Sequence, residues 1–201
     1  KSTRYAMGVI CSAFYGEPSK KLTVVGITGT KGKTTTTYMI KSMLEAAGHK
    51  TGLIGTIESI VGDKVTPASN TTPESIVMQK TLHEMVEAGL DSVVMEVSSQ
   101  GLMLDRVAGI DFDYGIFTNL SEDHIGPNEH KDFAEYLGWK AKLFTLCKTG
   151  IFNVDDTYCE DILKGHTCDV ITYGEKDGSD YQAEDLHLYK KDGELGITYH
   201  L

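Results

Sequence analysis

Apolar and polar positions alternate in blocks along the chain, and blocks of strand length are followed by stretches with helical spacing. The clearest pair begins with residues 22–27, a β-rich apolar run of the kind that forms a buried parallel strand. After a short polar turn, apolar residues recur at helical spacing over residues 33–47, and Gly48 is suited to end that helix. The pattern predicts a strand, a Gly-rich turn and a helix in immediate succession.

The same alternation continues on both sides of this pair. Further strands are predicted at residues 51–60, 91–97, 112–118, 150–154 and 170–173. Further helices are predicted at residues 5–15, 73–88, 130–147 and 160–164, and a loop with a hairpin turn at Gly62-Asp63 is predicted at residues 61–69. Alternating strands and helices imply right-handed crossovers, so the predicted fold is α/β with a mostly parallel, doubly wound sheet.

The two ends of the chain depart from this alternation. Residues 181–189 and 194–201 are strand-like and flank Lys191-Asp-Gly193, which is typical of an antiparallel hairpin. We therefore expect a small appended antiparallel sheet within residues 168–201. Residues 16–19 have the composition of a linker. Because the chain starts without Met and stops after a strand-like stretch, we expect a fragment of a longer protein.

The turn before the helix at residues 33–47 carries candidate chemistry. Gly29 and Gly32 allow backbone N–H groups to turn inward, and the helix N-terminus adds positive potential. Lys33 can reach the outer phosphates of a nucleotide, and the Thr34 hydroxyl can hold Mg²⁺. Ile27 stands where the strict Walker A pattern has its first glycine. The sequence predicts a phosphate-binding P-loop, and the alternative is a Gly-rich turn that binds nothing.

Polar residues also follow two other predicted strands. Glu96 ends an apolar strand, where a charge is costly unless it is paired or bound to a metal. His124 follows the next strand. In doubly wound sheets ligands bind beyond the carboxyl ends of the strands, so these residues are candidate metal ligands. The alternatives are an N-cap or ion pair for Glu96 and a surface or hydrogen-bonded histidine for His124.

Composition narrows the classes of function. The chain has 201 residues and a formal net charge of −10, which argues against nonspecific nucleic-acid binding because no basic excess is present. No apolar run approaches the length of a membrane span, so no membrane partner is expected. The four cysteines have neither C-x-x-C nor zinc spacing, and we expect free thiols in a reducing, cytoplasmic setting.

Six groups of residues come in the order and approximate spacing of the Mur ligase family. They are Gly26-x-x-Gly29-Thr-Lys-Gly32-Lys-Thr-Thr35, Asn70-Thr-Thr-Pro73, Glu96-Val-Ser-Ser99, Arg106, Thr118-Asn-Leu-Ser-Glu-Asp-His124 and Tyr136-Leu-Gly-Trp-Lys-Ala-Lys-Leu-Phe144. Over nearly its whole length the chain resembles the central ATP-binding domain of this family, most closely the MurE type. Residues 1–19 would then be the end of a preceding domain and a linker, and residues 20–201 the central domain, with the flanking domains largely absent.

The resemblance implies an ADP-forming amide ligase of peptidoglycan synthesis. It would use ATP and Mg²⁺ to add an amino acid to UDP-N-acetylmuramoyl-L-Ala-D-Glu through an acyl phosphate. We expect a monomer, and we expect the fragment alone to be inactive because the flanking domains complete such sites. Two alternatives are a related ligase, such as a folylpolyglutamate or cyanophycin synthetase, and a nucleotide-binding module without catalysis.

The resemblance also assigns roles to individual residues. ATP binding is assigned to Gly29, Thr30, Lys31, Gly32, Lys33, Thr34 and Thr35. Metal binding is assigned to Thr34, Glu96, His124 and Lys140, and catalysis to Lys33, His124 and Lys140. Acceptor binding is assigned to Asn70, Thr71, Thr72, Ser98 and Arg106.

Lys140 has a special role in this resemblance, because it matches a lysine that the family carries as a carbamate. Leu137, Ala141 and Phe144 fall on one helical face that we expect to pack on the sheet. Lys140 would flank that face and point toward the metal site, whereas Lys142 would point to solvent. The alternative is that Lys140 and Lys142 are two ordinary solvated lysines.

Overall fold

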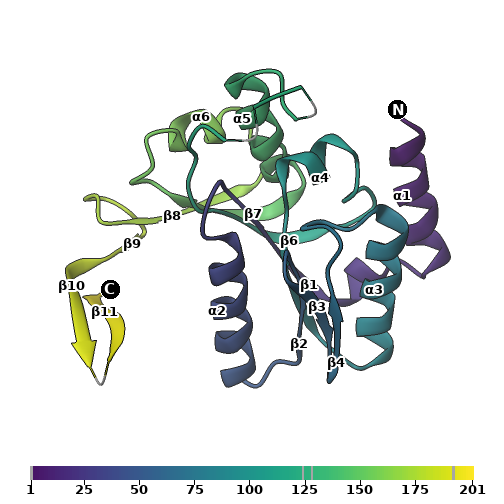
Figure 1. Ribbon diagram of the computed structural model, residues 1–201, viewed down its shortest axis with the longest axis horizontal. Helices are drawn as coiled ribbons and strands as arrows, with labels where there is room; N and C mark the ends of the chain where they lie inside the picture. Colours follow the sequence, from purple (N-terminus) through teal and green to yellow (C-terminus); the bar gives the residue numbers. More distant parts are fainter. Residues whose placement is uncertain (1, 124, 128, 192) are drawn as a thin grey trace.

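A nine-stranded sheet forms the centre of the computed structural model, which describes residues 2–123, 125–127, 129–191 and 193–201 (Figure 1). The strand order is β4-β3-β2-β5-β1-β6-β7-β8-β9. The strands are β1 (Thr23–Thr28), β2 (Thr51–Ile54), β3 (Glu58–Val61), β4 (Lys64–Pro67), β5 (Ser92–Glu96), β6 (Phe112–Phe117), β7 (Cys147–Asn153), β8 (Asp169–Gly174) and β9 (Tyr181–Gln182). Strands β2 and β5 to β9 are parallel to β1, and β3 and β4 are antiparallel additions at one edge.

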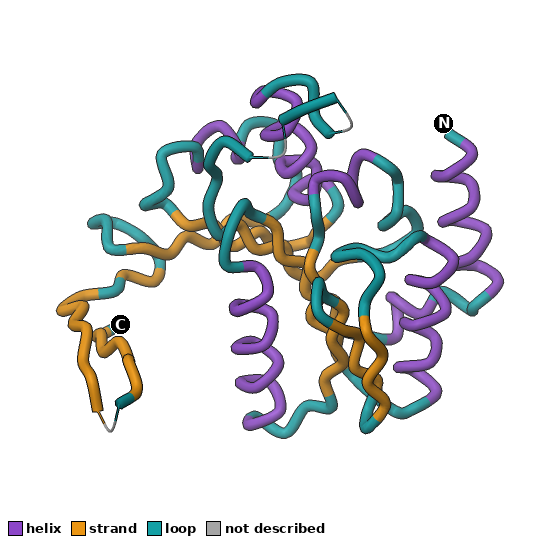
Figure 2. The backbone as a smooth tube through the Cα atoms, in the orientation of Figure 1, coloured by secondary structure: helices purple, strands orange, loops and turns teal. Residues whose placement is uncertain are grey.

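Helices cover both faces of this sheet, as predicted (Figure 2). The helices are α1 (Thr3–Phe14), α2 (Lys33–Ala46), α3 (Ser75–Glu87), α4 (Ser99–Met103), α5 (Phe133–Ala141) and α6 (Cys159–Leu163), with short 3-10 helices at Pro18–Lys21 and Lys142–Thr145. On one face, Ile40 and Leu44 of α2 pack on a small core of β-branched strand residues. The larger core on the other face takes side chains from α3, α4, α5 and α6.

The register of the three central strands places the candidate chemistry at one edge of the sheet. Strand β1 lies between β5 and β6, with Ile27 paired to Glu96 and Thr28 paired to Phe117. The carboxyl ends of these parallel strands therefore coincide. The loop that follows β1, the carboxylate that ends β5 and the segment that follows β6 meet at the same place.

The predicted strand at residues 51–60 is wrong, because it is two strands. Strand β2 ends at Ile54 and β3 returns antiparallel to it. A Cβ on Gly55 would lie 2.6 Å from Oε1 of Glu96, and the N–H of Thr56 donates to the same oxygen. The chain thus turns at Gly55 and Thr56 to contact the Glu96 carboxylate, and the local sequence pattern does not predict this contact. The hairpin turn at Gly62-Asp63 is confirmed, but β4 occupies residues that were expected to be loop.

The predicted helix at residues 130–147 is too long at both ends. Asp132 caps α5 by accepting a hydrogen bond from the N–H of Glu135, whose carboxylate accepts one from Lys131 N–H in return. The α-helix changes to a 3-10 helix at Lys142, and Cys147 already belongs to β7. Strand β7 therefore begins three residues earlier than the predicted 150–154.

Two further boundaries differ from the sequence prediction. Helix α3 begins at Ser75 with Glu74 as its N-cap, so Pro73 precedes the helix instead of opening it. Helix α4 was not predicted; Ser98 caps it by accepting a hydrogen bond from Gly101 N–H at 3.0 Å.

The small antiparallel sheet is confirmed as a separate hairpin of β10 (Glu184–Lys191) and β11 (Glu194–His200). Residues 181–182 were expected in it but form β9, which pairs with β8 instead. The hairpin exposes large apolar side chains, among them Leu188 at 79% and Leu195 at 83%. Figure 1 shows it beyond the β9 end of the main sheet, and its Leu195 lines a cavity together with Met39 of α2.

Two predictions from composition can be compared with the structure. The side chains of Cys11, Cys147, Cys159 and Cys168 are all free thiols, as expected. No helix within the described ranges combines the length and apolar character that crossing a bilayer requires.

Candidate active site

The P-loop connects the end of β1 at Thr28 to the start of α2 at Lys33. Gly29 has a φ of +150°, and a Cβ there would lie 2.0 Å from Oγ1 of Thr118. Gly32 has a φ of +83° and open space around its Cβ position. The two glycines are thus required for different reasons: Gly29 for close packing on the neighbouring loop, and Gly32 for its backbone conformation at the helix N-terminus.

Two lysine ammonium groups converge on this loop. Nζ of Lys33 donates to the carbonyl oxygens of Gly29 at 2.9 Å and Thr30 at 3.1 Å. Nζ of Lys140 donates to the same Gly29 oxygen at 2.7 Å. Burial lowers the pKa of Lys33. Burial, reinforced by the nearby charge of Lys33, lowers the pKa of Lys140 well below its ordinary value.

The carboxylate of Glu96 is only 1% exposed and is fixed by three donors. The Thr34 hydroxyl donates to Oε1 at 3.0 Å, and the Thr56 N–H donates to the same oxygen at 2.8 Å. The Thr56 hydroxyl donates to Oε2 at 3.0 Å. Glu96 thus faces the first turn of α2, where sequence reasoning placed a cation ligand.

A second polar cluster joins the segment before α3 to the start of α4. The Thr72 hydroxyl donates to the Glu96 carbonyl at 3.0 Å and accepts from the N–H of Ser98 at 3.0 Å. Arg106 donates to the Thr72 carbonyl at 3.1 Å and pairs with Glu74 at 2.8 Å. The Nε of Arg106 is buried and has no hydrogen-bond partner among the described residues. Arg106 and Ser98 of this cluster line the same cavity as Glu96.

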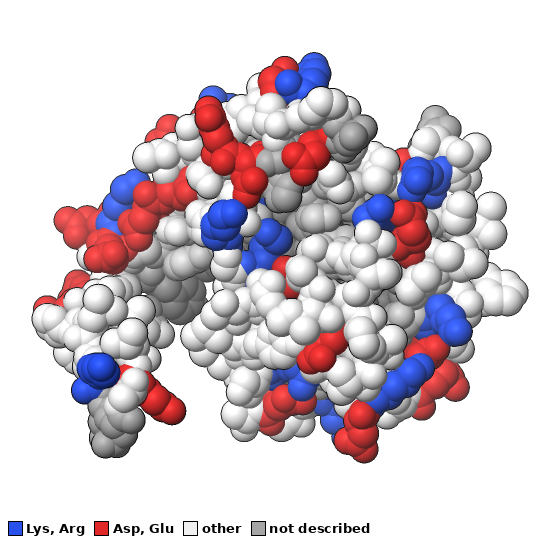
Figure 3. All heavy atoms as spheres, viewed as in Figure 1, with Lys and Arg blue, Asp and Glu red and all other residues white. Residues whose placement is uncertain are grey.

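The P-loop and the second cluster line one cavity of about 370 Å³. Its lining residues are Thr30, Lys31, Gly32, Lys33, Thr34, Thr56, Asn70, Thr71, Glu96, Ser98, Ser99, Gln100 and Arg106. Figure 3 shows basic side chains gathered above the N-terminal end of α2, with acidic side chains beside them. The structure therefore brings together most residues that were assigned to ATP, metal and acceptor binding.

The remaining predicted residues lie outside the lining of this cavity. Gly29 and Thr72 are buried, and Thr35 is exposed in the first turn of α2. Lys140 is 2% exposed and reaches the Gly29 carbonyl from α5. His124 falls outside the described residues.

The expected burial pattern of α5 is right only in part. Phe144 is fully buried, and Leu137 and Ala141 pack against the core although they are only half-buried. The helix also buries Tyr136 and Lys140, which the pattern did not predict. Nζ of Lys140 lies 4.5 Å from the centre of the Tyr136 ring, which favours a cation at that place. Lys142 is exposed, as expected. The two lysines thus differ as predicted, and the buried part of the helix is wider than the predicted face.

Sequence reasoning missed several residues that shape the site. Tyr136 shares a hydrogen bond with the Thr30 hydroxyl at 3.1 Å. The ring of His130 is fully buried and its Nε2 bonds with the Ser99 hydroxyl at 2.9 Å. Thr56 carried no signal, because it lay in the middle of the predicted strand at residues 51–60. Tyr136 lay within a quoted motif and could have been singled out as a large polar residue on a helix.

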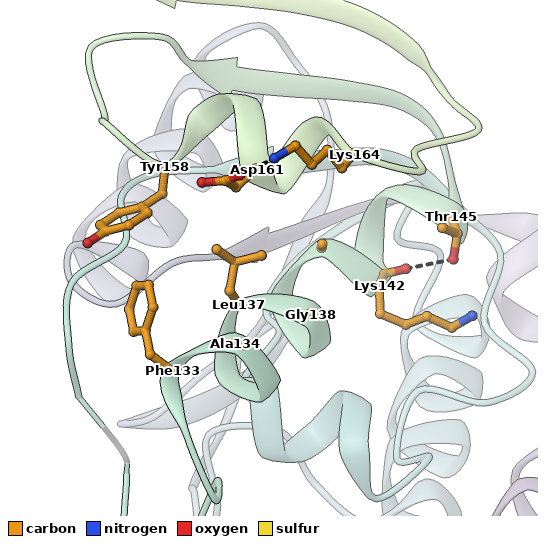
Figure 4. Close-up of a pocket in the computed structure, with 10 residues that line it drawn as sticks. Phe133, Ala134, Leu137, Gly138, Lys142, Thr145, Tyr158, Asp161 and Lys164 are labelled. Atoms are coloured by element: carbon orange, nitrogen blue, oxygen red, sulfur yellow. Dashed lines mark hydrogen bonds and ion pairs between the residues drawn. The ribbon is translucent and has the colours of Figure 1, made fainter.

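A larger and more apolar cavity, of about 600 Å³, lies between α5 and α6 (Figure 4). Its wall includes Phe133, Leu137 and Tyr158, and the rings of Phe133 and Tyr158 are 4.8 Å apart. None of the residues predicted to bind ATP, metal or acceptor lines it. Size alone therefore does not mark the functional site, and the polar cavity at the P-loop is the better candidate.

The polar cavity has the chemistry of a phosphate and cation site. The P-loop supplies backbone N–H groups, a helix N-terminus and the Lys33 ammonium, all of which suit an anion. Glu96 and Thr34 are oxygen donors of the kind that Mg²⁺ binds. Within the described ranges no group of three or more His, Cys, Asp or Glu could hold a metal ion.

The sheet topology and this loop define an α/β domain of the P-loop class, with a strand, a Gly-rich turn and a helix at the carboxyl edge of a parallel sheet. The chain belongs to the Mur ligase family: the model of the Mur ligase middle domain matches residues 27–200.

The similar proteins agree with this assignment. The chain is 47% identical to a UDP-N-acetylmuramoyl-L-alanyl-D-glutamate--2,6-diaminopimelate ligase of Clostridium tetani. The alignment spans 199 residues, which cover 99% of this chain and 41% of that relative. The chain is 49% identical to such a ligase of Clostridium acetobutylicum over 98% of this chain and 40% of that one. A solved ligase structure with the same name has a TM-score of 0.82 and 27% identity, covering 91% of this chain and 39% of that chain. The chain thus spans about two fifths of the length of these relatives.

Proposed function

We propose that this chain is the ATP-binding domain of an amide ligase that adds an amino acid to UDP-N-acetylmuramoyl-L-Ala-D-Glu, as its MurE-type relatives are named to do. The observation that carries the proposal is the single cavity in which Lys33, Thr34 and Glu96 face Arg106 and Thr71. A phosphate donor and an anionic acceptor could bind there side by side. Residues 1–19 would belong to a preceding domain and its linker, and residues 20–201 to the central domain.

The proposed reaction has two steps, and both balance. An acceptor carboxylate oxygen attacks the γ-phosphorus of ATP, and the bond to the β-phosphate oxygen breaks to give an acyl phosphate and ADP. An amine then attacks the acyl carbon, loses a proton and expels inorganic phosphate. Bound Mg²⁺ would supply charge neutralisation on the phosphates.

The chain's own residues would position the reactants and stabilise charge. Lys33 would leave the carbonyls of Gly29 and Thr30 and donate to the outer phosphate oxygens. Thr34 and Glu96 would hold the cation, with the backbone N–H groups of the P-loop around the phosphates. Arg106, which lines the cavity beside Thr71 and Ser98, would meet an anionic group of the acceptor with its guanidinium charge.

Lys140 is proposed to act as a carbamate, together with His124 at a second cation. The neutral Lys140 amine would attack CO₂ and release a proton, giving an anionic carbamate whose oxygens can serve as metal ligands. The buried position of Lys140 beside Lys33 supports this, because burial and the nearby charge of Lys33 lower the pKa of Lys140 and so favour the neutral amine that the step needs. The carbamate would carry the opposite charge to Lys33.

Phosphate release by the purified full-length protein tests the function. The assay contains ATP, Mg²⁺, UDP-N-acetylmuramoyl-L-Ala-D-Glu and either diaminopimelate or lysine. Release that requires both the acceptor and the amine supports the proposal, and the relatives' names make diaminopimelate the expected amine. Release with a folate acceptor plus glutamate, or ADP binding without any acceptor-dependent release, would contradict it.

A further inference from the structure

Thr56, in the turn between β2 and β3, holds both oxygens of the Glu96 carboxylate. Its N–H donates to Oε1 at 2.8 Å and its hydroxyl donates to Oε2 at 3.0 Å. The preceding Gly55 makes these two hydrogen bonds possible, since a Cβ at that position would lie 2.6 Å from Oε1. A two-point contact of this kind fixes the torsion of the carboxylate, which a single hydrogen bond would leave free to rotate.

The distribution of donors shows which oxygen remains available. Oε1 accepts from Thr34 and from the Thr56 N–H, so its two lone-pair sites are used. Among the described residues, Oε2 accepts only from the Thr56 hydroxyl. Oε2 therefore keeps one acceptor site for a cation, and Thr56 determines where that site points.

Packing offers no alternative reason for Thr56. Its side chain is exposed at the edge of the cavity, in contrast to the buried residues of β2 that precede it. The Thr56 hydroxyl oxygen also lies 3.1 Å from the Thr71 hydroxyl, and because its one hydrogen is donated to Glu96 it accepts in that second contact. A valine would keep the β-branch and the N–H contact while removing only the hydroxyl.

We propose that Thr56 is a positioning residue that orients Oε2 of Glu96 toward a divalent cation. This inference rests on the proposed function, because it takes Glu96 as the cation ligand. Partners that orient a metal ligand typically contribute about 10- to 100-fold in metal affinity. Thr56 would act through Glu96 and need not touch the cation itself.

Manganese binding to the full-length protein tests this without any turnover. Mn²⁺ replaces Mg²⁺, a non-hydrolysable ATP analogue is present, and free Mn²⁺ is measured by electron paramagnetic resonance. In Thr56→Val the Kd for Mn²⁺ is expected to rise about 10- to 100-fold, whereas Thr56→Ser, which restores the hydroxyl, stays close to wild type. Thr66→Val, an exposed threonine of β4, is the matched control and is expected to leave the Kd unchanged.

Glu96→Gln separates failure of the inference from failure of the proposed function. Unchanged Mn²⁺ binding in Glu96→Gln would contradict both. Weakened binding in Glu96→Gln together with unchanged binding in Thr56→Val would overturn the inference alone. Equal weakening in Thr56→Val and Thr56→Ser would also overturn it, since the hydroxyl would then not be the cause. Circular dichroism confirms that each variant is folded, and Thr56→Ala repeats the test if the valine variant is not.

Discussion

Lys33 and Lys140 donate hydrogen bonds to the same carbonyl oxygen, that of Gly29, at 2.9 and 2.7 Å. One lysine comes from the helix that follows the P-loop and the other from α5, more than a hundred residues later. Two lysine Nζ atoms from distant parts of the chain therefore meet at one backbone carbonyl. Of the two, Lys33 lines the polar cavity, so it is the lysine that an entering anion would meet.

Lys33→Ala in the full-length protein is expected to reduce turnover roughly 10²–10³-fold, because Lys33 is the ammonium that can reach the outer phosphates from α2. The melting temperature should change little. The Lys33 ammonium bonds only to backbone carbonyls of the loop, and water can replace it at those carbonyls. Lys41→Ala, on the same helix and paired with Glu45, is the control. Near-normal phosphate release in Lys33→Ala would show that Lys33 is not at the phosphates.

Lys140→Ala is expected to lose most activity if Lys140 works as a carbamate. Added acetate should restore part of the turnover by filling the vacated anion site, and Lys142→Ala should behave as wild type because Lys142 is exposed. The readout is phosphate release with and without acetate, in buffer with and without dissolved CO₂. Full activity of Lys140→Ala in CO₂-free buffer, or greater sensitivity at Lys142, would refute the assignment.

Gly29→Ala and Gly32→Ala are expected to differ sharply. At Gly29 the new Cβ would lie 2.0 Å from the Thr118 hydroxyl, so the loop must move and nucleotide binding should be lost. At Gly32 the site is open and only the positive φ is costly, about 1–2 kcal/mol. Binding of a fluorescent ATP analogue and thermal melting would test this, and equal loss in the two variants would contradict it.

Tyr136→Phe removes a buried hydroxyl that shares a hydrogen bond with Thr30 at 3.1 Å. Thr30 keeps its contacts with the Ser121 backbone, so the loop should survive. We expect a loss of about 1 kcal/mol in the free energy of unfolding. Urea denaturation measures it, with Tyr199→Phe on the exposed hairpin as the control. No difference between the two variants would mean that this hydrogen bond contributes nothing net.

Asp180 provides a pH-dependent contact at the end of β8. Hydrogen bonds from the Thr172 hydroxyl and N–H lower the pKa of its carboxyl. A lowered pKa in the folded state contributes stability above the unfolded value of about 3.9, and this is lost as the pH falls through the lower folded pKa. NMR titration should show the lowered pKa in wild type and a higher one in Thr172→Val. An equal pKa in both would contradict the assignment.

The sequence predicted the framework well where signals are local and repeated. The strand–loop–helix at the P-loop, the placement of Glu96 at a strand end and the hairpin were all visible as patterns of a few residues. The errors arose where tertiary contacts override local preference. Residues 51–60 look like one strand, but the chain must turn at Gly55 so that Thr56 can meet Glu96, which is 40 residues beyond Thr56. The full burial of Lys140 was missed as well: the helical pattern placed it beside the packed face, but no such pattern predicts that a lysine faces the core.

The hairpin of β10 and β11 has a practical consequence for producing this segment. A two-stranded sheet alone is marginally stable in water, and this one presents open edges with exposed Leu188 and Leu195. Unpaired strand edges with exposed apolar side chains favour aggregation as the protein is concentrated. The hairpin, and not the nine-stranded sheet, would therefore limit the solubility of this segment. A segment that ends at Ala183 would retain β9 and the hydrogen bond of 2.8 Å from the Ala183 N–H to the Gly174 carbonyl. It would omit the aggregation-prone hairpin.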